Sequence, residues 1–203
     1  MPGRPAITLW CGALALTLAL TVSSCSAEQE APAESTAEEP AAQETPSEAP
    51  RSFVMPTTCV EIVPPEVYER LTTNGLSLLR GPGSNSPDPV YPDGSPQEKL
   101  GGINCYFGDA EERQTYTLSV APITQADRAG VIDELLAQKF NVGQTSEGAL
   151  TYSLAGDDIS TPATFNTLYP EAWYEVLLVP GGRLAFEEAG RLAQVMREHS
   201  LRG

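Results

Sequence analysis

The side chains with catalytic or metal-binding chemistry in this sequence are mainly carboxylates, and two groups of them in the predicted domain are closely spaced. Asp109, Glu111 and Glu112 fall within one turn, and Asp157 and Asp158 are adjacent in another. Two well-placed carboxylates can hydrolyse a glycosidic bond, and grouped carboxylates can hold calcium, although neither group has the spacing of an EF-hand loop. We interpret both groups as solvated turn residues, and keep a carboxylate-based hydrolase and a calcium site as alternatives.

Other catalytic groups are scarce. His199 is the sole imidazole and falls at the end of the last predicted helix, where the helix dipole favours a cationic side chain, so we interpret it as a helix-end cap. Ser153 and Ser160 have no evident base partner. The sequence lacks the motifs of serine hydrolases, zinc peptidases, phosphate-binding loops and dinucleotide-binding folds. We therefore predict no catalytic residue, no metal site and no cofactor.

The N-terminus has the pattern of an export signal. Arg4 precedes an uncharged segment, residues 6–22, and Val22-Ser23-Ser24-Cys25 follows: an aliphatic residue, two small residues and a cysteine. That pattern predicts a lipoprotein signal peptide over residues 1–24, with lipid attached to the Cys25 thiol after cleavage. There are two alternatives. An ordinary signal peptidase could cut after Ala27, or the apolar segment could remain as an uncleaved anchor.

Two further cysteines lie beyond the signal. After loss of Cys11 with the signal peptide and lipidation of Cys25, an even number of cysteines remains: Cys59 and Cys105. Because disulfides persist in the oxidising compartments to which a chain is exported, we predict that these two cysteines pair. The loop that they close has about 47 residues, which corresponds to roughly 4 kcal/mol of stabilisation in the chain-entropy model. Two buried free thiols are the alternative.

Composition divides the rest of the chain into a tether and one domain. Residues 26–52 hold seven Glu, seven Ala and four Pro, with no large apolar side chain, which predicts a disordered spacer. We assign residues 25–52 to the lipidated cysteine and tether, and 53–203 to the domain. The net charge of the whole chain is -15, which excludes nucleic acid binding by bulk charge.

Hydrophobic periodicity predicts the elements of the domain. Helices are expected at 64–71, after Thr124 and at 183–199, and strands at 76–79, 104–107, 115–120, 150–154, 165–168 and 173–179. The last strand is nearly continuously apolar and should be central. Because the connections between strands are short, we predict an α+β domain: a five- or six-stranded, mainly antiparallel sheet with about three helices covering one face.

The stretch 81–97 contains five Pro and three Gly, so we expect no regular element there. Long loops of this kind are either functional or mobile insertions. Val90, Tyr91 and Pro92 are the candidate contact point if the loop recognises a partner. Trp173 and Tyr174, adjacent on a strand, should face opposite sides, one in the core and the other available to line a groove.

Five features together resemble small secreted lipoproteins of actinobacteria: Val22–Cys25, the Ala/Glu/Pro tether, Cys59-Val-Glu-Ile-Val-Pro-Pro-Glu before a helix, Cys105-Tyr-Phe-Gly in a strand, and the helix of the type ADRAGVIDELL that follows. The resemblance implies a location and a fold, because many such families have no assigned activity. We therefore expect a non-enzymatic lipoprotein, anchored by lipid to the extracytoplasmic face of the membrane, that binds a protein partner or an envelope ligand. A lipid or small-molecule carrier and a carboxylate-based cell-wall hydrolase are the alternatives.

Overall fold

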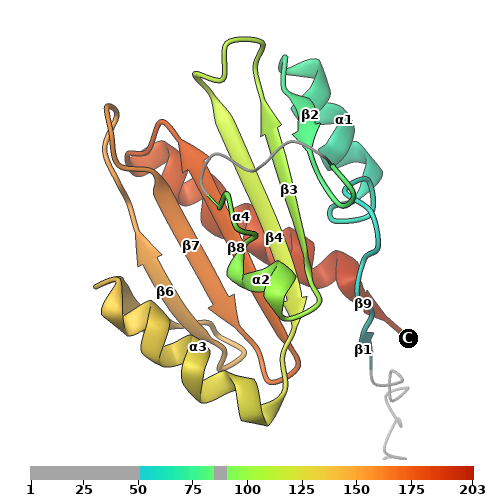
Figure 1. Ribbon diagram of the computed structural model, residues 1–203, viewed down its shortest axis with the longest axis vertical. Helices are drawn as coiled ribbons and strands as arrows, with labels where there is room; N and C mark the ends of the chain where they lie inside the picture. Colours follow the sequence, from blue (N-terminus) through green and yellow to red (C-terminus); the bar gives the residue numbers. More distant parts are fainter. Residues whose placement is uncertain (1–50, 85–90) are drawn as a thin grey trace, which may run out of the picture. The chain divides into compact units, whose positions relative to one another are not determined.

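The computed structural model describes residues 51–84 and 91–203. Cys25 and Val90, and with them the predicted signal peptide and most of the tether, lie outside the described residues. The described part is an α+β domain built on a seven-stranded antiparallel sheet in the order β2-β3-β4-β8-β7-β6-β5 (Figure 1). Its strands are β2 (Ser77–Arg80), β3 (Ile103–Gly108), β4 (Thr115–Pro122), β5 (Asn141–Gln144), β6 (Leu150–Leu154), β7 (Ala163–Leu168) and β8 (Ala172–Val179).

The sheet has one strand more than expected. β5 is the addition, and all four of its residues, Asn141–Gln144, are exposed at the sheet edge. An exposed polar strand has no alternation of buried and exposed residues, so hydrophobic periodicity could not indicate it. The prediction for β8 is confirmed, because it lies fourth among the seven strands and only its last residue, Val179, is not fully buried.

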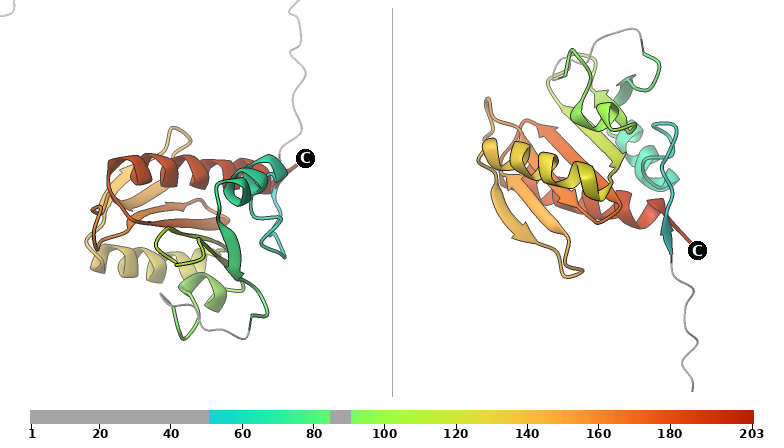
Figure 2. Two further views of the ribbon diagram at one scale, coloured as in Figure 1. Left: turned by 90° about the horizontal axis from the view of Figure 1, so that it is seen from above. Right: turned by 60° about the horizontal axis from the view of Figure 1, so that its bottom comes forward.

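Four helices pack on the sheet: α1 (Pro65–Thr73), α2 (Pro96–Lys99), α3 (Gln125–Ala137) and α4 (Arg183–Ser200). The prediction that helices cover one face is wrong. Seen from above, α4 lies on one side of the sheet, and α2 and α3 lie on the other (Figure 2). The reason is in β8, whose buried side chains alternate between the two sides, so that each side needs a cover.

The two sides of the sheet have separate cores. On the first side, α1 and α4 pack against apolar residues of the sheet through Leu71, Leu192 and Met196. On the second side, α3 packs through Val131 and Leu135 on a smaller cluster that includes Trp173. Trp173 and Tyr174 therefore do face opposite sides, and both are buried.

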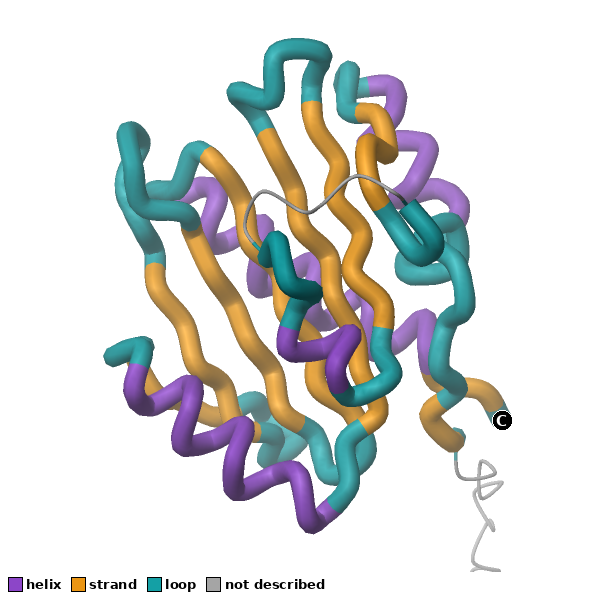
Figure 3. The backbone as a smooth tube through the Cα atoms, viewed as in Figure 1, coloured by secondary structure: helices purple, strands orange, loops and turns teal. Residues whose placement is uncertain are grey.

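The sequence predicted no regular element within residues 81–97, and this prediction is wrong at the end of the stretch. Their last two residues begin α2, whose N-terminus is closed by a capping box between Ser95 and Glu98. The Ser95 side chain accepts from the Glu98 backbone N–H, and the Glu98 carboxylate accepts from the Ser95 backbone N–H. Figure 3 shows this short helix and its flanking turns passing in front of the sheet.

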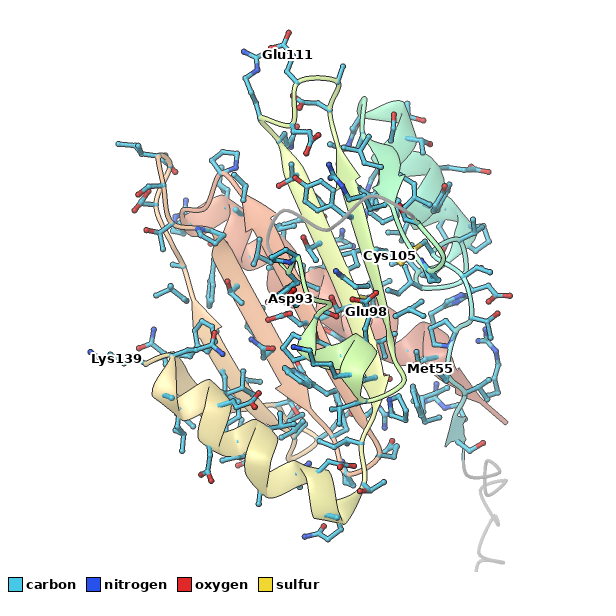
Figure 4. All side chains as sticks on the ribbon, in the orientation of Figure 1. Met55, Asp93, Glu98, Cys105, Glu111 and Lys139 are labelled. Atoms are coloured by element: carbon cyan, nitrogen blue, oxygen red, sulfur yellow. A yellow bond between two sulfur atoms is a disulfide. The ribbon has the colours of Figure 1, made fainter. Side chains whose placement is uncertain are left out.

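The predicted disulfide is confirmed. Cys59 and Cys105 are bonded, with their Cα atoms 5.6 Å apart, and the bond links the segment before α1 to β3 (Figure 4). Both sulfurs belong to the core on the α4 side. The bond therefore fixes α1 and its approach to the edge of the sheet.

The ends of the described domain are paired. β1 (Ser52–Phe53) and β9 (Leu201–Arg202) form a separate two-stranded antiparallel sheet. The Phe53 ring packs edge-on against Tyr174, at a centroid distance of 6.3 Å. The chain therefore enters this domain beside the point where it ends.

Two arginines hold the β7–β8 turn from opposite sides of the sheet. Arg128 of α3 donates to the backbone carbonyl of Tyr169 at 2.7 Å. Arg197 of α4 lies 4.1 Å from the centre of the Tyr169 ring and pairs with Glu171 at 2.6 Å. The turn thereby sets the positions of both long helices relative to β8.

Candidate functional site

A row of polar side chains crosses the α2 side of the sheet. In the strand register, Asn104 lies opposite Ser119, Ser119 opposite Glu175, and Glu175 opposite Asn166. Side chains directly opposite one another in a sheet point to the same face, so these four form one line over β3, β4, β8 and β7. All four are buried, with Glu175 at 4% exposure. We call this line the polar row.

Hydrogen bonds join the polar row to its surroundings. The Ser119 hydroxyl donates to Asn104 Oδ1, and the Trp173 indole N–H donates to Asn166 Oδ1, both at 2.8 Å. Among the residues that the structure describes, Tyr91 and Gln97 donate to the Glu175 carboxylate from outside the sheet. The row therefore contains a carboxylate in the central strand of the fold, where burial of a charge requires partners.

Both donors from outside the sheet reach the same carboxylate oxygen. The Gln97 side-chain amide and the Tyr91 hydroxyl each donate to Glu175 Oε2 at 3.2 Å. Gln97 is the fully buried residue of α2, and Tyr91 is half-buried. Tyr91 is the candidate contact point if the loop recognises a partner; its hydroxyl bonds to the carboxylate of the central strand, and Pro92 follows it.

Three buried atoms near the polar row have no hydrogen-bond partner in the described part of the chain. They are Gln97 Oε1, Thr117 Oγ1 and Asn166 Nδ2. The amide orientations follow from their partners, because an indole N–H can only donate and a carboxylate accepts. Buried polar atoms are almost always paired in native proteins. This face therefore holds an unused donor, an unused acceptor and an unused hydroxyl close to a buried carboxylate.

A groove opens beside this polar face, between α2 and α3. Its volume is about 360 Å³, its floor is Trp173, and Ala126, Gly130 and Glu134 line the α3 wall. Ala126 and Gly130 are four residues apart on one helix face, and a Cβ added at Gly130 would meet no atom within 4 Å. The small side chains therefore keep the groove open, and Trp173 connects it to Asn166.

The rim of the groove carries opposite charges. Lys99 lies on the α2 wall and Glu134 on the α3 wall. Neither belongs to an ion pair among the described residues. The groove thus offers an aromatic floor, a cation and an anion to whatever contacts it.

The first predicted group of acids lies at the tip of the β3–β4 hairpin, where Figure 4 shows Glu111. Glu112 pairs with Arg80 at 3.3 Å and accepts from the Tyr106 hydroxyl at 3.1 Å. The hydrogen bond from Arg80, followed by that from Tyr106, lowers the pKa of Glu112. Asp109 accepts from the Arg113 backbone N–H at 2.7 Å. These contacts support their interpretation as turn residues.

In the second group of acids, the Asp157 carboxylate is likewise engaged in contacts within its own turn. Asp157 Oδ1 accepts from the backbone N–H groups of Ile159, Ser160 and Thr161, at 2.9, 2.6 and 3.1 Å. These bonds, led by that from Ser160, lower the pKa of Asp157. Within residues 51–84 and 91–203, no group of three or more His, Cys, Asp and Glu side chains could hold a metal ion.

His199 lies in the last turn of α4, as expected. Burial, and then the charge of Arg202, lower the pKa of its imidazole. Both effects oppose the cationic form of the ring, which is the form that the helix dipole favours. Ser153 is buried in β6, and the Ser160 backbone N–H serves the turn at Asp157.

Sequence reasoning missed the residues of the polar row. One signal was available: Glu175 is the single charged residue in the otherwise apolar run Ala172–Val179. A charge in a fully buried strand must find partners. Those partners, Tyr91 and Gln97, are 84 and 78 residues away, and no local pattern connects them with Glu175.

No family model, no curated protein and no solved structure matches this chain. Among the described residues, none of the helices is long and apolar enough to span a membrane.

Proposed function

We propose that this protein is a non-enzymatic lipoprotein, anchored by lipid on Cys25 to the extracytoplasmic face of the membrane, and that it displays a ligand-binding domain. The tether, residues 26–52, would hold that domain away from the lipid surface. Support for the compartment comes from the lipobox-like Val22–Cys25 and from the Cys59–Cys105 disulfide, because disulfides are rare in reducing compartments.

The observation that carries the binding role is the groove between α2 and α3, next to buried polar atoms that have no hydrogen-bond partner within residues 51–84 and 91–203. Small-ligand sites are typically concave, with an apolar or aromatic lining and a few convergent polar groups. Here the lining includes Trp173 and Leu100, and the Trp173 indole is hydrogen-bonded to Asn166, whose Nδ2 has no partner among the described residues. The non-enzymatic reading is supported by Asp109, Glu112 and Asp157, whose carboxylates are engaged in hydrogen bonds or an ion pair.

A groove-filling variant tests the binding site. Gly130→Arg places a long side chain in the groove without a clash at Cβ, and replaces a glycine that is unfavourable in a helix. Ala129→Arg is the matched control, because Ala129 is exposed on the same helix and does not line the groove. We expect native mass spectrometry of protein released from its own membrane to find a bound species that Gly130→Arg loses and Ala129→Arg keeps. A species retained by Gly130→Arg would refute the groove as its site.

The same spectra test the anchor. The intact mass is expected to show cleavage before Cys25 and the added mass of the lipid, and Cys25→Ser should abolish both. An unlipidated wild-type protein cut after Ala27 would contradict the anchor and leave the binding site untouched.

A small-molecule carrier is the second candidate, favoured by the size of the groove. Its volume of about 360 Å³ lies within the usual range of small-ligand sites, roughly 300–1,000 Å³. A bound species of a few hundred daltons would support the carrier. A bound species of protein size would support partner recognition.

A further inference from the structure

Residues 91–101 form a segment that carries its own backbone hydrogen bonds. The Gly94 N–H donates to the Tyr91 carbonyl, and the N–H groups of Lys99, Leu100 and Gly101 donate to carbonyls one turn back in α2. The capping box closes the N-terminal end of the helix. We call residues 91–101 the cover segment. Because these bonds are internal, the segment can move without breaking the ladder of the sheet.

One end of the cover segment is fixed to the sheet. A Cβ placed on Gly102 would lie 2.2 Å from the Val120 carbonyl oxygen, so the backbone here presses directly on β4. Gly101, just before it, has φ of 81°, a conformation that other residues rarely adopt. Leu100 packs against the second core beside this point. Gly101 and Gly102 are therefore placed to act as a pivot.

Beyond the pivot, the cover segment is tied to the sheet by Glu175. Tyr91 and Gln97, near its beginning and its middle, both donate to Oε2 of that carboxylate. α2 lies over β3 and β4 (Figures 1 and 3). One carboxylate oxygen thus connects two points of the segment to the central strand.

The surface beneath the cover segment is poorly suited to permanent burial. It includes Ser119 and Glu175 of the polar row, and Thr117 Oγ1 has no partner among the described residues. Gln97 Oε1, on the segment itself, also has none. Unpaired polar atoms gain partners from water or from a ligand when they are uncovered. The groove leaves the α3 flank of the segment open.

We propose that the cover segment swings open on Gly101 and Gly102, and that the polar row is a recognition surface which it uncovers. The uncovered surface presents a carboxylate, amides and hydroxyls. It suits an uncharged or cationic ligand rich in hydrogen-bonding groups, and repels an anion. This inference concerns a motion of the unliganded protein, so it does not depend on the proposed anchor or on occupation of the groove.

Thiol labelling tests the opening. The test uses full-length protein carrying Cys11→Ser and Cys25→Ser. In this background, Ser119→Cys places a thiol under the cover segment, and Ala189→Cys places one on the buried face of α4. Both positions are fully buried. Iodoacetamide should label Cys at 119 at least about tenfold faster than at 189, because local opening is more frequent than global unfolding. Equal rates that follow global unfolding would overturn the proposal.

A second variant tests the role of Glu175. Tyr91→Phe removes one hydrogen bond to the carboxylate and is expected to accelerate labelling at 119 about tenfold, with no effect at 189. Tyr68→Phe is the matched control, because the Tyr68 hydroxyl makes no hydrogen bond to any described residue and its ring packs on the α4 side. If the two variants changed labelling at 119 equally, Glu175 would not be what holds the cover segment.

Discussion

The two sides of the central sheet differ in what covers them. On one side, α4 buries an apolar surface, and Tyr174, Val176 and Leu178 of β8 contribute to one continuous core. On the other, the same strand presents Trp173, Glu175 and Leu177, and a short helix covers a polar row. Apolar burial is non-directional, and its contribution to stability grows with the apolar area that is buried. Buried polar groups, in contrast, are stabilising only when they are paired. The first side therefore holds the larger apolar core, and the second, with its buried polar groups, is the side that we propose for binding.

The largest effect should come from the disulfide, which belongs to the apolar side. Cys59→Ser opens a cross-link between residues 46 apart, and the chain-entropy model gives a loss of roughly 4 kcal/mol in the free energy of unfolding. Urea denaturation of wild type and variant measures it. Equal midpoints for the oxidised and reduced wild-type protein would contradict the prediction.

Shortening a buried side chain of α4 should lower the free energy of unfolding nearly as much. Leu192 is fully buried in the first core, so Leu192→Ala is expected to lower the free energy of unfolding by about 2–5 kcal/mol. Exposed Leu184 on the same helix provides the control, because Leu184→Ala should change stability by less than about 0.5 kcal/mol. A small loss at Leu192 would mean that the α4 side is not the dominant core.

The polar side should respond in the opposite direction. Thr117→Val replaces a buried hydroxyl that has no partner among the described residues with a methyl group of similar shape. Removing an unpaired polar atom is expected to leave stability unchanged or to raise it by about 1 kcal/mol. Ser119→Ala, which deletes a hydroxyl bonded to Asn104, should instead lower it by about 1 kcal/mol. Equal losses of stability in Thr117→Val and Ser119→Ala would contradict the prediction that the paired hydroxyl stabilises the fold and the unpaired one does not.

The smallest effect is a pH dependence at the end of α4. Burial lowers the folded-state pKa of His199, so the unfolded chain binds the proton more readily than the folded protein. The contribution of His199 to stability is therefore complete above its unfolded pKa, about 6.5, and falls as the pH drops below it. His199→Gln should show a smaller decrease in the free energy of unfolding between pH 7 and pH 5 than wild type. A steeper decrease in the variant would contradict the direction of the shift.

Much of the fold was predictable because the residues involved form local patterns. The six expected strands, the helix after Thr124 and the final helix all occur, since alternation and 3.6-residue periodicity are properties of neighbouring residues. The disulfide followed from counting cysteines. β5 was missed because Asn141–Gln144 are exposed on an edge, and α2 was missed because surrounding prolines obscured the Ser95–Glu98 capping box.

The site was less predictable than the fold. The near-continuous apolar run in β8 already indicated burial on both sides, and two-sided helix cover follows from it. Glu175 was the visible exception in that run. Its partners come from another segment, and the groove depends on how α2 and α3 lie over the sheet, which periodicity does not determine. Tyr91 was singled out as a possible contact for a partner, and no local pattern indicated that its hydroxyl bonds to the Glu175 carboxylate.

Native-state hydrogen exchange of the unmodified protein, followed at low concentrations of urea, tests the difference between the two sides most directly. A single helical turn does not persist away from the sheet, so the amides of Lys99, Leu100 and Gly101 exchange whenever the cover segment opens. The account predicts that they exchange at least about a hundredfold faster than the Leu192 and Ala193 amides of α4, with little dependence on urea, as local openings do. If both groups exchanged at the same rate, with the full urea dependence of global unfolding, the two sides would be one cooperative unit and the account would be wrong.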